Sequence, residues 1–272
     1  MCATCGCSHE SILGVEPGHA HPHDHVHPHE PAHPTGAPAG DASATRLIAL
    51  ERDVLARNDR LAAHNRGWLA GRGVFAMNLM SAPGAGKTAL LEGTVHALAG
   101  RAMLEVIEGD QATANDAERM RAAGVRALQI NTGTACHLDA AMIGRALTEL
   151  GPAPGTVLAI ENVGNLVCPA LFDLGEHVRV VLVSVTEGDD KPEKYPHMFR
   201  AADVLVLSKV DLLPHVRFDV ERCLARAHEI NPGLRVFRTS ATQGQGLATW
   251  CEWLLESSRA ARAQATRAAT TA

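Results

Sequence analysis

Residues 81–88 read Ser-Ala-Pro-Gly-Ala-Gly-Lys-Thr, which is close to the phosphate-binding pattern G-x-x-x-x-G-K-[ST]. Ser81 stands at the position of the first glycine. An apolar run at 74–80 precedes the loop and a helix-like stretch at 89–99 follows it. A phosphate-binding loop needs this order of strand, glycine-rich turn and helix. The stretch therefore predicts a nucleoside triphosphate site in an α/β fold.

Each residue type in this loop has a physical role. Two glycines allow the backbone to point its amides at phosphate oxygens, and the helix start adds partial positive charge. Lys87 would reach the β- and γ-phosphates, and the Thr88 hydroxyl would bind Mg²⁺. The predicted phosphate contacts are those of Gly84, Ala85, Gly86, Lys87 and Thr88.

Strands and helices alternate from residue 74 onward. Nearly continuous apolar runs predict strands at 74–80, 102–107, 125–130, 156–161, 178–185, 204–208 and 234–239. Helical patterns lie at 89–99, 112–123, 137–150, 191–200, 218–230 and 247–265. Such apolar runs are typical of parallel strands that are covered on both faces. We expect an α/β domain with a doubly wound, mostly parallel sheet and with its binding loops at the carboxyl ends of the strands.

Composition divides the 272 residues into unequal parts. We expect a disordered Cys/His-rich metal-binding tail at 1–40, an N-terminal helix at 41–70, the P-loop domain at 71–265 and a disordered end at 266–272. The tail is rich in proline and histidine, which cannot build a packed core. The net charge of −5 argues against nucleic-acid binding. The lack of a membrane-length apolar run and of a signal-peptide pattern predicts a cytoplasmic protein without a membrane partner.

A second motif points to guanine. Ser208-Lys-Val-Asp211 follows a buried strand and resembles the pattern N-K-x-D, with Ser208 in place of asparagine. Asp211 could accept hydrogen bonds from N1–H and the 2-amino group of guanine, whereas adenine offers neither donor there. The stem of Lys209 could cover the base. Ser240 and Ala241 resemble the last base-contacting loop. Together these motifs favour GTP over ATP.

Two acidic loops could complete the catalytic site. Asp110 follows the second predicted strand and is our first choice as a further Mg²⁺ ligand beside Thr88. Glu161 follows the fourth strand, and Gly164 could give an amide to the γ-phosphate. Alternatively, the glutamate only solvates a loop end. We expect Lys87, Thr88, Asp110 and Glu161 to carry catalysis through positioning and charge. No residue can be named as the base that activates water.

The chain start and the tail offer metal ligands. Cys2, Cys5 and Cys7 suit Ni²⁺ in a square-planar site or Zn²⁺ in a tetrahedral one, and a redox Cys-x-x-Cys is the rival interpretation. Alternating imidazoles would hold several ions loosely, as expected of weak nickel storage, unless the tract is only a solvated tail. These histidines are His19, His21, His23, His25, His27 and His29.

A third metal-ligand set lies inside the P-loop domain. Cys136 and His137 begin the predicted helix after the third strand, and Cys168 follows the Glu161 loop. Three donors are too few for a closed four-coordinate site within one chain. Two copies related by a two-fold axis could share an ion, or water could complete the site. A nucleotide-dependent homodimer of this kind would couple metal capture to the nucleotide state. The alternative is that these residues are structural.

The ordered set of motifs resembles the HypB family of hydrogenase nickel-incorporation GTPases. It comprises Cys2-x-x-Cys5-Gly-Cys7, the His-rich tail, residues 81–88, Glu108-Gly-Asp-Gln111, Asn131-Thr-Gly133, Cys136-His-Leu-Asp139, Glu161-Asn-Val-Gly-Asn165-Leu-Val-Cys168 and Lys194-Tyr-Pro196. The resemblance implies a slow, metal-regulated, dimerising P-loop GTPase that uses GTP and Mg²⁺. It further implies delivery of nickel to the large-subunit precursor of [NiFe]-hydrogenase together with a HypA-type metallochaperone.

The resemblance also assigns the two metal sites. It makes Cys2, Cys5 and Cys7 the high-affinity nickel site, and Cys136, His137 and Cys168 the nickel or zinc site of the GTPase domain. Two alternatives remain open: a urease-type nickel GTPase, and a nickel-storage protein whose GTPase is vestigial. The two cysteine sets favour the hydrogenase type, and the intact Lys87, Thr88, Asp110 and Asp211 argue against a vestigial enzyme.

Overall fold

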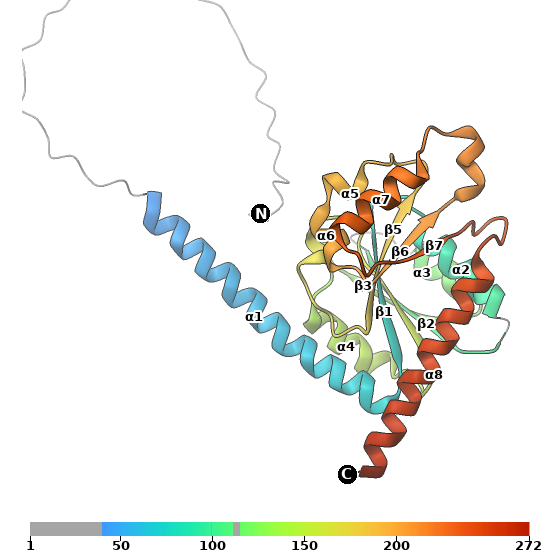
Figure 1. The fold of residues 1–272 in the computed structure, drawn as a ribbon. Coiled ribbons are helices and arrows are strands. Elements are labelled where there is room, and N and C mark those ends of the chain that lie inside the picture. Colours follow the sequence, from blue (N-terminus) through green and yellow to red (C-terminus); the bar gives the residue numbers. More distant parts are fainter. Residues whose placement is uncertain (1–39, 99, 111–114, 272) are drawn as a thin grey trace, which may run out of the picture. The chain divides into compact units, whose positions relative to one another are not determined.

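Seven strands form one sheet in the order β3-β2-β4-β1-β5-β6-β7, and each neighbouring pair is parallel (Figure 1). The computed structural model describes residues 40–98, 100–110 and 115–271. The strands are β1 (Phe75–Ser81), β2 (Leu104–Asp110), β3 (Arg126–Asn131), β4 (Val157–Glu161), β5 (Val178–Ser184), β6 (Val204–Ser208) and β7 (Arg235–Arg238). The predicted α/β class with a doubly wound parallel sheet is confirmed.

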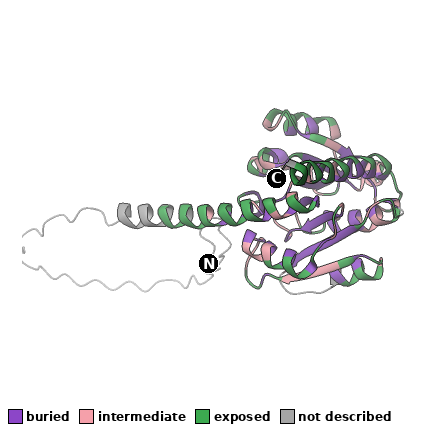
Figure 2. Ribbon diagram, turned by 90° about the horizontal axis from the view of Figure 1, so that it is seen from below, coloured by how far each residue is buried: buried purple, intermediate pink, exposed green. Residues whose placement is uncertain are grey.

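Helices cover both faces of the sheet. They are α1 (Gly40–Arg72), α2 (Lys87–Leu98), α3 (Asn115–Ala122), α4 (Ala140–Leu150), α5 (Lys191–Lys194), α6 (Pro196–Ala201), α7 (Val220–Ile230) and α8 (Leu247–Thr271), with short 3-10 turns η1 (Cys168–Ala170) and η2 (Val210–His215). Successive side chains of β1 point to opposite faces. Met77 belongs to the buried cluster that includes residues of α2, α3 and α8, whereas Ala76 belongs to the cluster that includes residues of α1 and α4. The strands between these layers are mostly buried (Figure 2).

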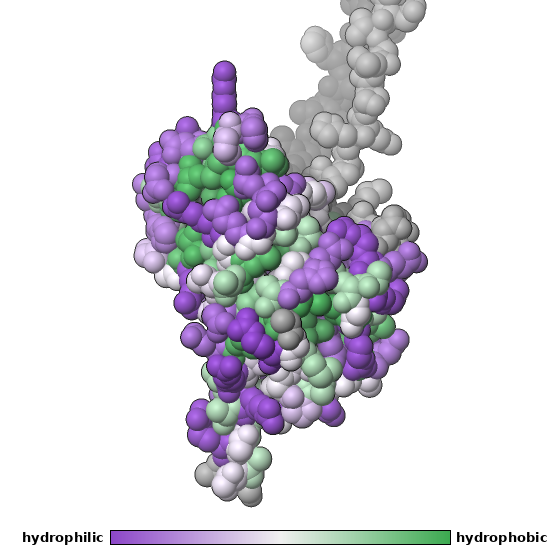
Figure 3. Space-filling model, turned by 90° about the vertical axis from the view of Figure 1, so that its right-hand side faces the viewer, coloured by the Kyte–Doolittle hydropathy of each residue, from purple (hydrophilic) through white to green (hydrophobic). Residues whose placement is uncertain are grey.

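A tryptophan on α8 anchors the first of these layers. Trp250 is fully buried, meets the Phe237 ring edge-on at a centroid distance of 5.3 Å, and donates its indole N–H to Thr94 Oγ1 at 3.0 Å. The hydrogen bond satisfies the polar atom that such burial would otherwise strand. On this side of the molecule, hydrophilic side chains surround smaller apolar areas (Figure 3).

The differences from the expected helix bounds are clearest at three of the predicted helices. The predicted helix 191–200 is two helices, α5 and α6, because Pro196 has no N–H to continue the first. The predicted helix 137–150 begins only at Ala140, since the Asp139 side chain caps it by accepting a hydrogen bond from Met142 N at 2.7 Å. Helix α8 continues to Thr271, beyond the expected end at residue 265.

The chain divides into two compact units, Met1–Val54 and Leu55–Ala272. In the first unit the structure describes the start of α1, where Leu50 and Val54 are exposed. The second unit contains the remainder of α1 and the whole sheet. The predicted ligands at Cys2, Cys5 and Cys7 and the alternating histidines lie outside the described residues. Within the described part of the chain, no helix is both long and apolar enough to cross a membrane.

Candidate functional site

The P-loop lies between β1 and α2, at the carboxyl edge of the sheet. Gly84 and Gly86 have φ values of 75° and 100°, in the left-handed region that favours glycine. Lys87 is the first residue of α2, and its Nζ donates to Ser81 Oγ at 3.1 Å. The serine at the first-glycine position therefore gives the buried lysine a polar partner. Positive φ at the two glycines is what allows a loop to turn its amides toward a phosphate group.

Two residues of the predicted base-binding motif hold the P-loop from the end of β6. Ser208 Oγ donates to the Ala85 carbonyl oxygen at 2.7 Å, and Lys209 Nζ donates to the Gly84 carbonyl oxygen at 2.8 Å. Lys209 itself has φ of 58°, which is uncommon for a residue with a side chain. Such outliers persist where the surrounding structure fixes them. Serine in place of asparagine thus contributes a bond to the P-loop backbone.

A cavity of about 250 Å³ lies beside these residues. Its lining includes the predicted base-contacting residues Lys209, Asp211 and Ala241, together with Thr242, for which the sequence gives no signal. Ser240 is fully buried, and its hydroxyl accepts a hydrogen bond from Gln243 N at 3.1 Å. The same hydroxyl lies 3.1 Å from Thr242 Oγ1, so both of these contacts are within the loop. The position next to the P-loop and the carboxylate at Asp211 suit a guanine base.

The end of β4 meets the phosphate loop. Thr88 Oγ1 donates to Glu161 Oε1 at 2.9 Å. A Cβ atom added at Gly164 would lie 2.9 Å from Pro83 Cγ, so this glycine packs directly against the P-loop. Asp110 ends β2, one strand away in the sheet. The structure thus brings Thr88, Glu161 and Gly164 together at the edge where the γ-phosphate would lie.

Buried carboxylates give this edge an unusual electrostatic state. Burial, and secondarily the charges of Glu161, Asp116 and Asp110, raise the pKa of Glu108 to about 7. Burial also raises the pKa of Glu161 to about 7, although Lys87 opposes the shift. The Oε2 atoms of both glutamates have no hydrogen-bond partner among the described residues. A divalent cation with its waters would supply the missing partners, so the donor set fits Mg²⁺.

Replacing Glu161 by glutamine is expected to stabilise the nucleotide-free protein at high pH. The folded-state pKa lies above the ordinary value, so the stability contribution of Glu161 is present below about pH 4.5 and is lost as the pH rises through about 7. At pH 8 the Glu161→Gln protein should be more stable by about 1–3 kcal/mol, and most of this difference should vanish at pH 5. Urea unfolding without nucleotide or metal measures this difference in the free energy of unfolding. The same difference at pH 5 and pH 8 would contradict a raised pKa of Glu161.

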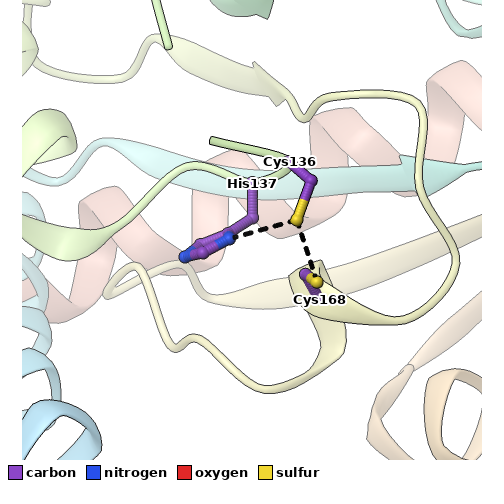
Figure 4. Close-up of side chains that lie close together, drawn as sticks. All are labelled: Cys136, His137 and Cys168. Atoms are coloured by element: carbon purple, nitrogen blue, oxygen red, sulfur yellow. Dashed lines mark hydrogen bonds between the residues drawn. The ribbon is translucent and has the colours of Figure 1, made fainter. Parts of the chain in front are cut away.

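The second predicted cluster is also brought together. Cys136 and His137 lie in the loop between β3 and α4, and Cys168 begins η1. The Sγ atoms of the two cysteines are 3.0 Å apart, and Cys136 Sγ lies 3.9 Å from His137 Nδ1. The three ligand atoms all lie within 4.8 Å of one another, and the side chains converge from two loops (Figure 4). Soft and borderline donors at such separations can share one nickel or zinc ion.

The imidazole of His137 is held in a half-buried environment beside the two cysteines. Burial lowers the pKa of His137, with Asp139 opposing, which favours the neutral form that binds metals. Its ring stacks on Phe172 with a centroid distance of 3.9 Å and an interplanar angle of 24°. The sequence gives no signal for Phe172, because an aromatic residue after a loop does not show what it touches. It gives none for Asp116 either, since acidic residues are common in the first turn of helices.

Comparison with known proteins supports the nucleotide-binding assignment. Residues 75–238 match the CobW/HypB/UreG nucleotide-binding domain. The chain is 54% identical over 218 residues to "Hydrogenase maturation factor HypB" of Azotobacter vinelandii, covering 80% of this chain and 72% of that protein. It is 46% identical over 285 residues to the protein of the same name from Escherichia coli K12, covering 93% of this chain and 98% of that one.

A solved structure has the same fold. The crystal structure of HypB from Helicobacter pylori in complex with nickel superposes with a TM-score of 0.70 at 39% sequence identity. The match covers 75% of this chain and 95% of that one. The sequence and fold comparisons therefore agree on one family.

Proposed function

The chain belongs to the HypB family of hydrogenase maturation factors, and on that premise we propose that it hydrolyses GTP to control the delivery of nickel to the large-subunit precursor of [NiFe]-hydrogenase. One observation carries the proposal: a single loop joins the nucleotide site to the cysteine–histidine cluster. Glu161, at its start, accepts a hydrogen bond from the P-loop threonine. Cys168, at its end, lies against Cys136.

The residues between these ends contact both sites. Gly164 packs against the P-loop proline. Asn165 donates from Nδ2 to the Cys136 carbonyl oxygen at 3.4 Å and accepts from Val167 N at 2.8 Å. A change at the γ-phosphate that moves Gly164 would therefore move the ligand at Cys168. Such a shared element is what couples two binding sites.

Hydrolysis would rest on positioned charge. Lys87 would stabilise the negative charge that develops on the β- and γ-phosphates. Thr88 and Asp110 would hold Mg²⁺, with Glu161 orienting the threonine hydroxyl. When bound, Mg²⁺ neutralises part of the phosphate charge. We expect turnover to be slow and to respond to metal, because the loop that completes this site also carries Cys168.

The cluster has three donors in one chain, so a fourth must come from elsewhere. We propose that a second copy of the chain meets the first at this site in a homodimer that holds nickel or zinc. The homodimer would exchange nickel with a HypA-type metallochaperone. Cys2, Cys5 and Cys7 would form the high-affinity nickel site.

The alternating histidines would add weak nickel storage. Deletion of residues 9–40 should therefore impair hydrogenase maturation only at low nickel, and added nickel should restore it. If the GTPase is vestigial and the chain only stores nickel, the deletion should instead abolish hydrogenase maturation completely. The measurement is hydrogenase activity of cells carrying the deletion, across a series of nickel concentrations.

Replacing Asp211 by asparagine is expected to change the nucleotide preference. The substitution removes the carboxylate that would accept hydrogen bonds from N1–H and the 2-amino group of guanine. GTP binding should therefore weaken about 100-fold. Xanthine has a carbonyl in place of that amino group, so the asparagine amide could donate to it. Titrations with GTP, XTP and ATP test this: XTP should bind the Asp211→Asn protein better than GTP, and unchanged GTP affinity would contradict the assignment.

A further inference from the structure

Helix α1 carries two buried asparagine side chains that contact segments next to the cysteine–histidine cluster. Asn58 is 5% exposed; its Nδ2 donates to the Asp173 carbonyl oxygen at 2.8 Å, and its Oδ1 accepts from Ala140 N at 2.9 Å. Ala140 is the first residue of α4, so its N–H has no partner inside that helix. The asparagine of one helix thus satisfies the start of another.

Asn65 makes the same connection two turns later. It is 2% exposed, and its Nδ2 donates to the carbonyl oxygens of Ala140 at 2.8 Å and Leu174 at 3.0 Å. The two amides therefore bridge the same two segments. One segment follows His137 by three residues. The other follows Cys168 and the stacking ring of Phe172.

The helix is held close to these segments. A Cβ atom added at Gly175 would lie 2.5 Å from the Ala62 carbonyl oxygen and 2.7 Å from Asn65 Cβ. One added at Gly144 would lie 3.0 Å from Asn65 Oδ1. Arg66 also pairs with Asp173 at 2.7 Å. These contacts hold Ala62, Asn65 and Arg66 of α1 close to the segment that contains Asp173 and Gly175.

We propose that Asn58 and Asn65 are positioning residues that set the separation of the two ligand loops, so that metal affinity depends on the docking of residues 55–72 of α1. The inference rests on the proposed metal role of the Cys136, His137 and Cys168 cluster. Neither asparagine belongs to the proposed set of ligands. They act by fixing backbone atoms next to its ligands, as groups outside the coordination sphere commonly do.

Docking and metal binding are then thermodynamically linked. If docked α1 raises the affinity of the cluster, metal must stabilise docked α1 by the same factor. Because α1 follows the predicted metal-binding tail directly in the sequence, the helix connects the two sets of ligands along the chain. Bound metal should slow amide hydrogen exchange in residues 55–72.

The test uses the full chain with Cys2→Ser, Cys5→Ser and Cys7→Ser, so that thiolate-to-nickel charge-transfer absorption reports the internal cysteines. Ni²⁺ is titrated against a competing chelator. Asn58→Ala and Asn65→Ala should each weaken binding about 10- to 100-fold and alter the absorption spectrum. Gly175→Ala keeps both amides but displaces the helix, and it should weaken binding similarly.

Thr94→Val is the matched control, because it removes two buried hydrogen bonds on the opposite face of the sheet, to Leu90 O and from Trp250 Nε1. It should lower the unfolding temperature without changing nickel affinity. Unchanged affinity in both asparagine variants would overturn the inference and leave the metal site intact. An absorption band that survives Cys168→Ala in the starting chain would instead overturn the metal site, and the inference with it.

Discussion

Replacing Lys87 by alanine is expected to lower the rate of GTP hydrolysis about 10²- to 10⁴-fold. The ammonium group is buried at the start of α2, beside Ser81 Oγ, and burial lowers its pKa although Glu161 and other carboxylates oppose the shift. A positive charge fixed at a buried site of low dielectric constant interacts strongly with the negative charge that develops on a phosphate. The alanine variant keeps the loop glycines but loses this charge.

Single-turnover hydrolysis with saturating GTP measures the loss, because it separates the chemical step from weak binding. Thr94→Val serves as the control, since it lies on α2 beyond the phosphate site and should leave the rate unchanged. Thermal unfolding of both variants detects any general loss of structure. A Lys87→Ala rate within tenfold of the unsubstituted chain would contradict the assignment of this lysine.

Replacing either cluster cysteine by serine is expected to weaken nickel binding at the internal site at least about 100-fold. Serine keeps the size of the side chain but offers a much poorer donor than thiolate. The effect should be similar for Cys136→Ser and Cys168→Ser, because their Sγ atoms lie together at 3.0 Å. Charge-transfer absorption in the chain without the three N-terminal thiols measures it.

Cys223→Ala is the matched control for these variants. Burial, reinforced by nearby aspartates, raises the pKa of the Cys223 thiol to about 12, which disfavours the thiolate form that binds metal. Its replacement should lower stability through lost packing and leave nickel affinity unchanged. If the control lost nickel as completely as the cluster variants, the effect would reflect unfolding, and the site assignment would fail.

The nucleotide site follows from the sequence because its residues are close along the chain. The two glycines, Lys87 and Thr88 occupy fixed offsets in one loop, and the flanking apolar run and helix give the fold class. The Lys209 and Asp211 pair is local in the same way. What spacing cannot give is the bond from Ser208 Oγ to the Ala85 carbonyl oxygen, which joins residues more than a hundred positions apart.

The cysteine–histidine cluster was only partly predictable. Residue type selected Cys136, His137 and Cys168, but the expectation that the first two begin a helix was wrong, because Asp139 caps that helix. Their meeting depends on the packing of two loops. Asn58 and Asn65 gave no signal at all, since a polar residue on a charged helix is usually solvated. Burial, which decides their role, is a property of the folded chain.

Control of nickel delivery by the GTP cycle can be tested in cells whose only copy of the chain carries Lys87→Ala. The measurement is hydrogenase activity with and without millimolar nickel in the medium. We expect activity to be lost and added nickel not to restore it, because the step that fails is the nucleotide-driven transfer. Full activity without added nickel would contradict the account and leave the chain as a nickel reservoir.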